Sequence, residues 1–243
     1  MWFDNGVIMI GALLAAVVSG SSGFAFALIG MAIWLHVMPP MRVVPLVVLC
    51  SILLNLVFVW RLRHDVSFKR LAPFLAGAVL GVPLGVLTLH SLDPVLLRNA
   101  IGALLLVYSS YMLMRTHMPI VSPSPAIAHV LDGGVGMLGG FMGGSTGLNG
   151  LLPTLWCGLR GWSKEMQRGV FQTYILLVHG YTLAWLGGVG GITHQTMSDL
   201  ALCLPALALG GFIGLKLFKR TSEKGFRLVI LWLFVLSGVT LLV

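Results

Sequence analysis

The sequence predicts an all-α integral membrane protein made of two inverted repeats. Its composition indicates this class first, because 58% of the residues are hydrophobic and 9% are charged, whereas a soluble domain carries roughly a quarter charged residues. The apolar runs are also too long and too continuous for the alternating strands of a membrane β-barrel. Finally, the same layout of runs occurs twice along the chain. Together these observations predict membrane helices with internal symmetry, a common design among transporters.

The first half of the chain contains one interrupted apolar run and three continuous ones. Gly20-Ser21-Ser22-Gly23 interrupts the run at 7–37, and residues of this kind break a helix where no water can satisfy the backbone. Asp93 and Pro94 suit the start of a helix, as a cap and a first helical residue. The continuous runs are 43–60, 71–89 and 95–114, and a Pro/Ser linker at 118–127 follows them.

The second half repeats this layout. The run at 129–159 is broken at 143–150, and continuous runs at 169–187, 199–215 and 228–243 follow it. At a separation of 124 residues, Gly20–Gly23 aligns with Gly144–Gly147 and Asn55 with His179; at 129, Gly81, Gly85 and Arg98 align with Gly210, Gly214 and Arg227. We interpret the chain as a tandem duplication, with one transmembrane repeat at 1–117 and a second at 128–243.

The distribution of basic residues favours inverted repeats. If each broken run is a re-entrant hairpin, each half has three full spans, and thirteen of the 15 Lys and Arg lie on one face, opposite Arg42 and Arg98. If each broken run crosses the membrane once, the repeats are parallel, with eight ordinary spans in two four-helix repeats. Ten Lys and Arg then lie on one face and five on the other. The positive-inside rule favours the first arrangement, with both termini on the periplasmic face. Pieces of about 12–14 residues beside each break are also too short for a roughly 30 Å core.

The two breaks are predicted to face each other and bind a small anion. A helix that restarts after Gly23 or Gly147 presents backbone N–H groups and a partial positive charge. Small hydroxyl and amide side chains supply neutral donors, and glycine allows close approach, so no buried cation is needed. The predicted substrate-binding residues are Ser21, Ser22, Gly23, Gly144, Ser145, Thr146, Gly147 and Asn149.

Polar residues inside apolar runs are further candidates for coupling or substrate contact. They are Asn55, Gln172, Tyr174 and His179. His179 either binds protons and anion or is a neutral histidine hydrogen-bonded between helices. A structural role is the alternative for Asn55, which would join two helices by a hydrogen bond. Asp132 is most simply a helix cap. The glycines 81, 85, 210 and 214 have the small-x-x-x-small spacing of helix packing.

Other site classes find little support. The chain has no Walker-type phosphate loop, and its three cysteines show no metal-ligand spacing, so we expect no cofactor and no metal. The net charge of +8 is explained by basic loops rather than nucleic-acid binding. The expected partners are a small anionic substrate and the lipid bilayer, with proton coupling and homo-oligomer formation left open.

The second break, Gly143-Gly144-Ser145-Thr146-Gly147 with Asn149, Gly150 and Pro153 after it, resembles the sulfite exporter TauE/SafE family of permeases, as does its weaker copy in the first half. The resemblance covers nearly the whole chain. It implies a bacterial inner-membrane carrier that moves sulfite, sulfonates or related organic acids, usually outward. The first break departs from the pattern, with Phe24-Ala25-Phe26 in place of further glycine and Ile29 at the position matching Pro153.

The predicted function is therefore secondary transport of small anions by alternating access around the two breaks. A passive anion channel is an alternative. An intramembrane hydrolase is a weaker one, because Ser145 lies in a Gly-x-Ser-x-Gly sequence and His179 follows on another run. The strand that normally precedes this motif is missing, so we expect no enzyme.

Overall fold

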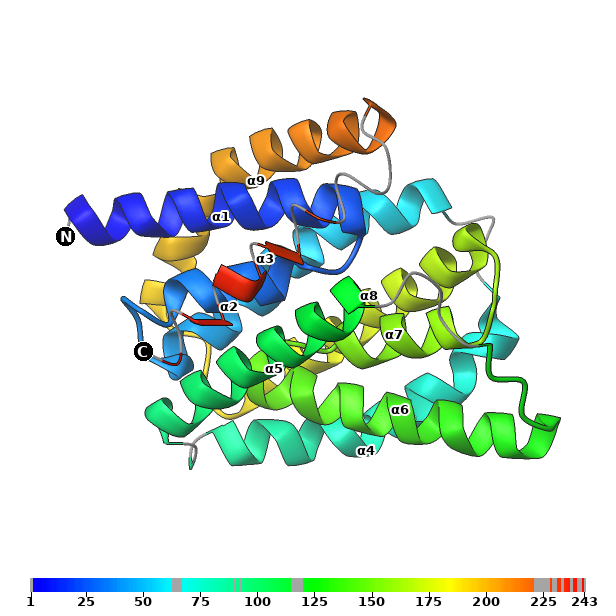
Figure 1. Cartoon of the computed structure of the whole chain (residues 1–243). Helices are drawn as coiled ribbons and strands as arrows, with labels where there is room; N and C mark the ends of the chain where they lie inside the picture. Colours follow the sequence, from blue (N-terminus) through cyan, green and yellow to red (C-terminus); the bar gives the residue numbers. More distant parts are fainter. Residues whose placement is uncertain are drawn as a thin grey trace. The chain divides into compact units, whose positions relative to one another are not determined.

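The computed structural model describes residues 2–62, 67–89, 91, 93–114 and 120–220, with 228, 231–232, 234–236, 238–239 and 242. These residues form helices and no strand, which confirms the all-α class (Figure 1). The longer helices are α1 (Trp2–Ser22), α3 (Pro40–Leu62), α4 (Phe68–Leu89), α5 (Pro94–Met114), α6 (Pro125–Thr146), α8 (Lys164–Gly188) and α9 (His194–Arg220). Two short helices, α2 (Phe26–Trp34) and α7 (Leu151–Leu159), follow the breaks.

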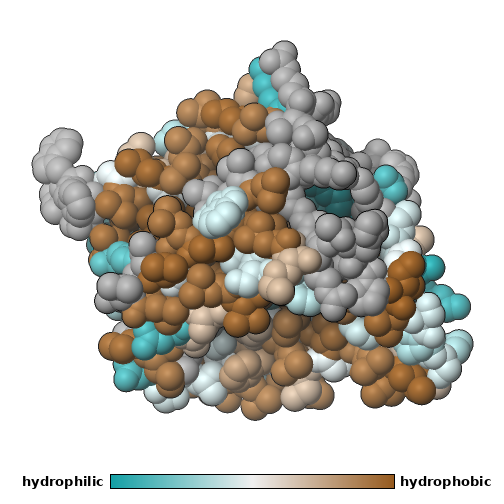
Figure 2. Space-filling view, viewed as in Figure 1, coloured by the Kyte–Doolittle hydropathy of each residue, from teal (hydrophilic) through white to brown (hydrophobic). Residues whose placement is uncertain are grey.

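Six of the described helices are long and apolar enough to cross a membrane, by length and composition. They are α1, α3, α4, α5, α6 and α9. Large apolar side chains remain exposed on them, as at Leu80 and Leu87 of α4, which are 62% and 60% exposed. Hydrophobic residues cover much of the surface seen in Figure 2. Such a surface is typical of a protein whose solvent is lipid.

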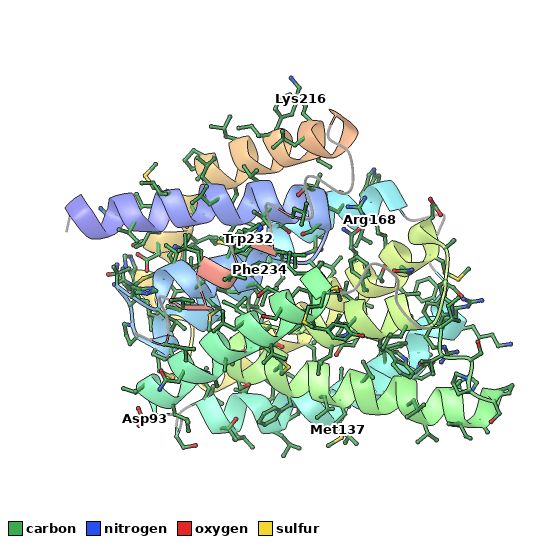
Figure 3. The ribbon with its side chains drawn as sticks, viewed as in Figure 1. Asp93, Met137, Arg168, Lys216, Trp232 and Phe234 are labelled. Atoms are coloured by element: carbon green, nitrogen blue, oxygen red, sulfur yellow. The ribbon has the colours of Figure 1, made fainter. Side chains whose placement is uncertain are left out.

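The six helices are a different set from the six spans that the sequence predicts. The predicted spans at 169–187 and 228–243 are absent from it: α8 is not among the six, and much of 228–243 lies outside the described residues. In their place stand α1 and α6, which precede the two breaks. Asp93 does start α5, where its carboxylate accepts the N–H of Val95 at 2.8 Å (Figure 3).

The expected pieces of 12–14 residues beside each break are wrong. The piece before each break has 21 residues in α1 and 22 in α6, whereas α2 and α7 after the breaks have 9 each. Both helices begin before the apolar runs, at Trp2 and Pro125, and both continue through the hydroxyl residues, where Thr146 donates to Met142 O within α6. The two helices that precede the breaks end at Gly23 and Gly147, which have positive φ values of +86° and +76°.

The chain forms two compact units, each described here by itself. The first comprises 1–50, 92–117 and 193–243, and the second 51–91 and 118–192. In the first unit α1 packs against α9 and α2, and in the second α6 packs against α4 and α7 (Figure 1). Each unit thus combines helices from both halves of the sequence.

Glycines bring backbone against backbone in the same way in both units. In the first, a Cβ at Gly210 or Gly214 would collide with the backbone of α1 at Leu13 and Val17; in the second, a Cβ at Gly81 or Gly85 would collide with α6 at Met137 and Phe141. Separations of 124 and 129 relate these contacts, so the duplication seen in the sequence is also present in the packing. The interpretation of these four glycines as packing positions is confirmed. Arg227 lies outside the described residues, as does the side chain of Arg98.

Candidate functional site

The break between α6 and α7 is a buried helix end followed by a new helix start. Gly147 adopts the left-handed conformation, and its N–H donates to Gly143 O at 3.0 Å, which ends α6. Leu148 N–H donates to Met142 O at 3.3 Å. Backbone bonding then resumes at Thr154, whose N–H donates to Gly150 O at 3.1 Å.

Between these bonds lie four N–H groups without an acceptor among the described residues. They belong to Asn149, Gly150, Leu151 and Leu152, and Pro153 has no N–H to bond. The segment is buried, since Asn149 and Leu151 are 1% and 2% exposed. Leaving a buried donor unpaired costs about 1–3 kcal/mol, so a cluster of them indicates a place for a ligand or water. At the start of a nine-residue helix they also carry its positive dipole end.

Helix α8 holds this break in place. The Asn149 side chain donates from Nδ2 to Ile175 O at 3.1 Å, and His179 Nε2 lies 3.1 Å from Gly147 O. Tyr174 donates its hydroxyl to Gly136 O at 2.7 Å and so fixes α8 against α6. The structure thus brings together four of the predicted residues: Gly147, Asn149, Tyr174 and His179.

The bond to Gly147 sets the tautomer of His179. A carbonyl oxygen only accepts, so Nε2 carries the proton and Nδ1 of the neutral ring holds a lone pair. Nδ1 is buried and has no partner among the described residues. In this tautomer Nδ1 is an acceptor, and only a protonated ring could donate from it to an anion.

The predicted hydroxyl donors point into their own helices. Ser145 donates to Phe141 O at 2.8 Å, Thr146 to Met142 O at 2.7 Å, and Ser21 to Val18 O at 2.7 Å. In this arrangement the hydroxyls offer lone pairs rather than protons to the break. Ser145 is also not bonded to His179, so these two described residues lack the nucleophile–base hydrogen bond of a hydrolase.

The first break belongs to the other unit and is more fully satisfied. Gly23 N–H donates to Ser19 O at 2.7 Å, and Ser22 Oγ accepts the N–H of Ala25 at 3.3 Å while donating to Val18 O. Ala25 corresponds to Asn149 at a separation of 124, and Asn149 has no such acceptor for its N–H. The predicted pairing of the two breaks stays a prediction.

Two other candidates lie away from the contacts of the break. Asn55 on α3 donates to Ser51 O of its own helix at 2.9 Å, and its Oδ1 is a buried acceptor without a donor among the described residues. The expected bond from Asn55 to a second helix is therefore not formed. Gln172 is buried on α8, seven residues before His179 and on the same face.

Asp132 is not the helix cap that the sequence suggests. It lies inside α6, where it accepts Trp156 Nε1 at 2.5 Å and Arg160 Nη1 at 3.1 Å and so ties α7 to α6. The spacing of Trp156 and Arg160, one turn apart on α7, is the sequence signal for this contact. The sequence analysis expected free N–H groups after Gly147 but did not name Gly150, Leu151 and Leu152 as their carriers. Pro153, which suits the first turn of a helix, marks where α7 begins.

Comparisons with curated proteins and with solved structures return no match. A family model does match: the one described as Sulfite exporter TauE/SafE aligns with residues 8–241, nearly the whole chain. That family consists of membrane transporters, in agreement with the apolar helices and with the resemblance noted from the second break. The chain belongs to the sulfite exporter TauE/SafE family.

Proposed function

We propose that this protein is a secondary transporter that exports small anions such as sulfite, sulfonates or related organic acids, and that the α6–α7 break is its main binding site. The observation that carries the proposal is the run of four N–H donors at 149–152, three of them in buried residues, in a segment that α8 holds in place. Membership of an exporter family supports the class of substrate.

A site of this kind suits a carrier because it attracts an anion without a fixed buried cation. Each hydrogen bond to a charged group contributes about 1.5–3 kcal/mol. Three such bonds give about 4.5–9 kcal/mol, which corresponds to dissociation constants from roughly millimolar to below micromolar. An anion held this way binds selectively and still leaves.

In the proposed mechanism, alternating access exposes the breaks to each side of a bacterial inner membrane in turn. We propose inverted repeats with both termini on the periplasmic face, as the basic residues suggest. Gly144, Ser145, Thr146, Gly147 and Asn149 would line the main site. Ser21, Ser22 and Gly23 of the first break would contribute less, because their segment has fewer unsatisfied donors.

Proton coupling would pass through His179. Its Nδ1 lone pair has no partner among the described residues, while Nε2 stays bound to Gly147 O. Burial disfavours the charged ring, so protonation would require the anion beside it. Protonation would place a donor and a positive charge beside the break, and release of the proton would remove both. Binding of the anion and of the proton would therefore support each other.

The proposal is tested with purified protein in proteoliposomes. Uptake of sulfite, sulfonates and carboxylates is measured with and without a pH gradient, in the wild type and in a variant with Ser145, Thr146 and Asn149 all changed to Ala. We expect accumulation that a protonophore abolishes, and a raised KM in the variant. Unchanged kinetics in the variant would exclude these three side chains from substrate contact. Flux that never exceeds the electrochemical gradient would indicate a channel instead.

A further inference from the structure

The duplication allows an ion pair in the first unit to be compared with its counterpart in the second. Arg42 at the start of α3 binds Asp199 of α9 through two bonds, Nε to Oδ2 at 2.6 Å and Nη2 to Oδ1 at 2.8 Å. Asp199 is 1% exposed and also accepts from Gln195 at 3.1 Å. This guanidinium and this carboxylate satisfy each other.

The counterpart in the second unit has a cation but no carboxylate. At the separations of 124 and 129 residues that relate the helices, Arg42 corresponds to Met166 and Asp199 to Arg70. The two are again in contact, and Arg70 Nη1 donates to Met166 Sδ. A thioether is a weak acceptor, so the half-buried Arg70 lacks the strong partner that its counterpart position has.

The surroundings offer Arg70 an aromatic ring and a helix N-terminus but no carboxylate partner among the described residues. The Arg70 guanidinium carbon lies 4.7 Å from the centre of the Trp162 ring, and that of Arg160 lies 5.4 Å from the same ring. Asp132 is occupied by Arg160, and no carboxylate pairs with Arg70 among the described residues. Met166 lies in the first turn of α8, where the helix dipole is positive.

Two further charged groups share the first turns of α8. Glu165 is exposed and forms no ion pair within the described part of the chain. Arg168 lies three residues further along α8 (Figure 3). Arg160 is already paired with Asp132, so Arg70 and the N-terminus of α8 are the positive groups that have no carboxylate partner among the described residues. The cluster therefore has an excess of positive charge beside an aromatic ring.

We propose that Arg70 is a docking site for a small oxyanion, whose oxygens bind the guanidinium in place of Met166 Sδ. A planar guanidinium suits two oxygens of a sulfite, sulfonate or phosphate group. The N-terminus of α8 adds its dipole, whereas the N–H of Met166 is already bonded to the Ser163 hydroxyl. The site is distinct from the α6–α7 break, because Met166 lies nine residues from Ile175, about 14 Å along α8. It exists whether or not the bound anion is transported.

The test measures binding in neutral detergent with sulfite and with inorganic phosphate as probes. Tryptophan fluorescence reports binding, because Trp162 lies against Arg70. Arg70→Gln removes the guanidinium, whereas Met166→Glu supplies an internal carboxylate like that of Asp199. Lys69→Gln is the matched control, since it removes an exposed charge from the next residue.

We expect both Arg70→Gln and Met166→Glu to weaken binding by about tenfold or more, the loss of hydrogen bonds to a charged group. Lys69→Gln should change it by less than about twofold, because exposed charges contribute little. Met166→Glu should keep or raise the unfolding temperature, so a lost signal there is not a folding defect. Wild-type affinity in both Arg70→Gln and Met166→Glu would overturn the proposal.

A second arm identifies the source of the oxyanion. The same variants are titrated with phosphatidylglycerol in neutral nanodiscs. If binding of that lipid depends on Arg70 and binding of free sulfite or phosphate does not, the site belongs to a lipid headgroup. Free anions that bind through Arg70 while proteoliposomes show no anion transport would refute the proposed function and leave the docking site standing. Anion transport together with wild-type binding in both variants would support the proposed function and refute the docking site.

Discussion

Replacing Leu151 by proline tests the anion site at a single backbone atom. Leu151 is the first residue of α7, a position where proline is well tolerated in helices. Its N–H makes no hydrogen bond to a described residue, so proline removes a donor without breaking a bond of the fold. The preceding residue, Gly150, has φ −84° and ψ −19°, where a following proline ring crowds its N–H but meets no Cβ.

The expected effect follows from one lost bond to the anion. A hydrogen bond to a charged group contributes about 1.5–3 kcal/mol, so affinity should fall about 10- to 150-fold. The side chain of Leu151 is 2% exposed, and its loss would also disturb packing. Leu151→Ala is therefore the control, because it loses the side chain but keeps the N–H.

The assay compares anion transport by the two variants in proteoliposomes. KM for sulfite should rise with proline and stay close to the wild-type value with alanine, and both variants should elute as the wild type does in gel filtration. Equal KM values in Leu151→Pro and Leu151→Ala would show that this N–H does not contact the substrate. The reasoning from unsatisfied donors would then be refuted.

Three further predictions concern packing, coupling and topology. Gly81→Ala should lower the stability by about 1–3 kcal/mol in thermal unfolding, because its Cβ has no room, whereas Gly134→Ala, with open space, should be neutral; equal stabilities would contradict the packing described. His179→Gln can keep a donor to the break but cannot bind a proton, so it should transport without a response to the pH gradient; a retained response would exclude this residue from coupling. Lys69 and Lys216 are both exposed, and the side chain of Lys216 extends away from α9 (Figure 3). Cysteines at these two positions should be labelled from the same side of the membrane if the repeats are inverted. Labelling from opposite sides would support parallel repeats.

The helices were predictable from the sequence because apolar runs of membrane length have few other structures available. The exact ends of the broken segments were not. Serine and threonine at positions 145 and 146 suggest a break by type, yet α6 continues through both, and their hydroxyls bond back to the preceding turn. That choice depends on a rotamer, which composition and spacing do not specify.

The glycine spacing predicted close packing but not which helices would pack. Gly81 and Gly85 meet α6, and Gly210 and Gly214 meet α1, so each partner comes from the other half of the sequence. Likewise, the bond from Asn149 to Ile175 joins residues that no local pattern connects. Contacts of this kind depend on the topology of the chain, whereas the residue types that make them can be read beforehand.

The two copies of the repeat differ in a way that locates function. Backbone contacts at Gly85 and Gly214 are preserved, because any side chain there would separate two helices. Polar positions have diverged, so that Asn55 of one copy matches His179 of the other, and the carboxylate of one unit is replaced by Arg70 in the second. A scaffold needs both copies of its packing residues, whereas a binding site needs only one copy of each functional group. The break with the larger run of unsatisfied donors, the histidine and the arginine that lacks a carboxylate partner lie in the second unit, and that is where an anion should bind.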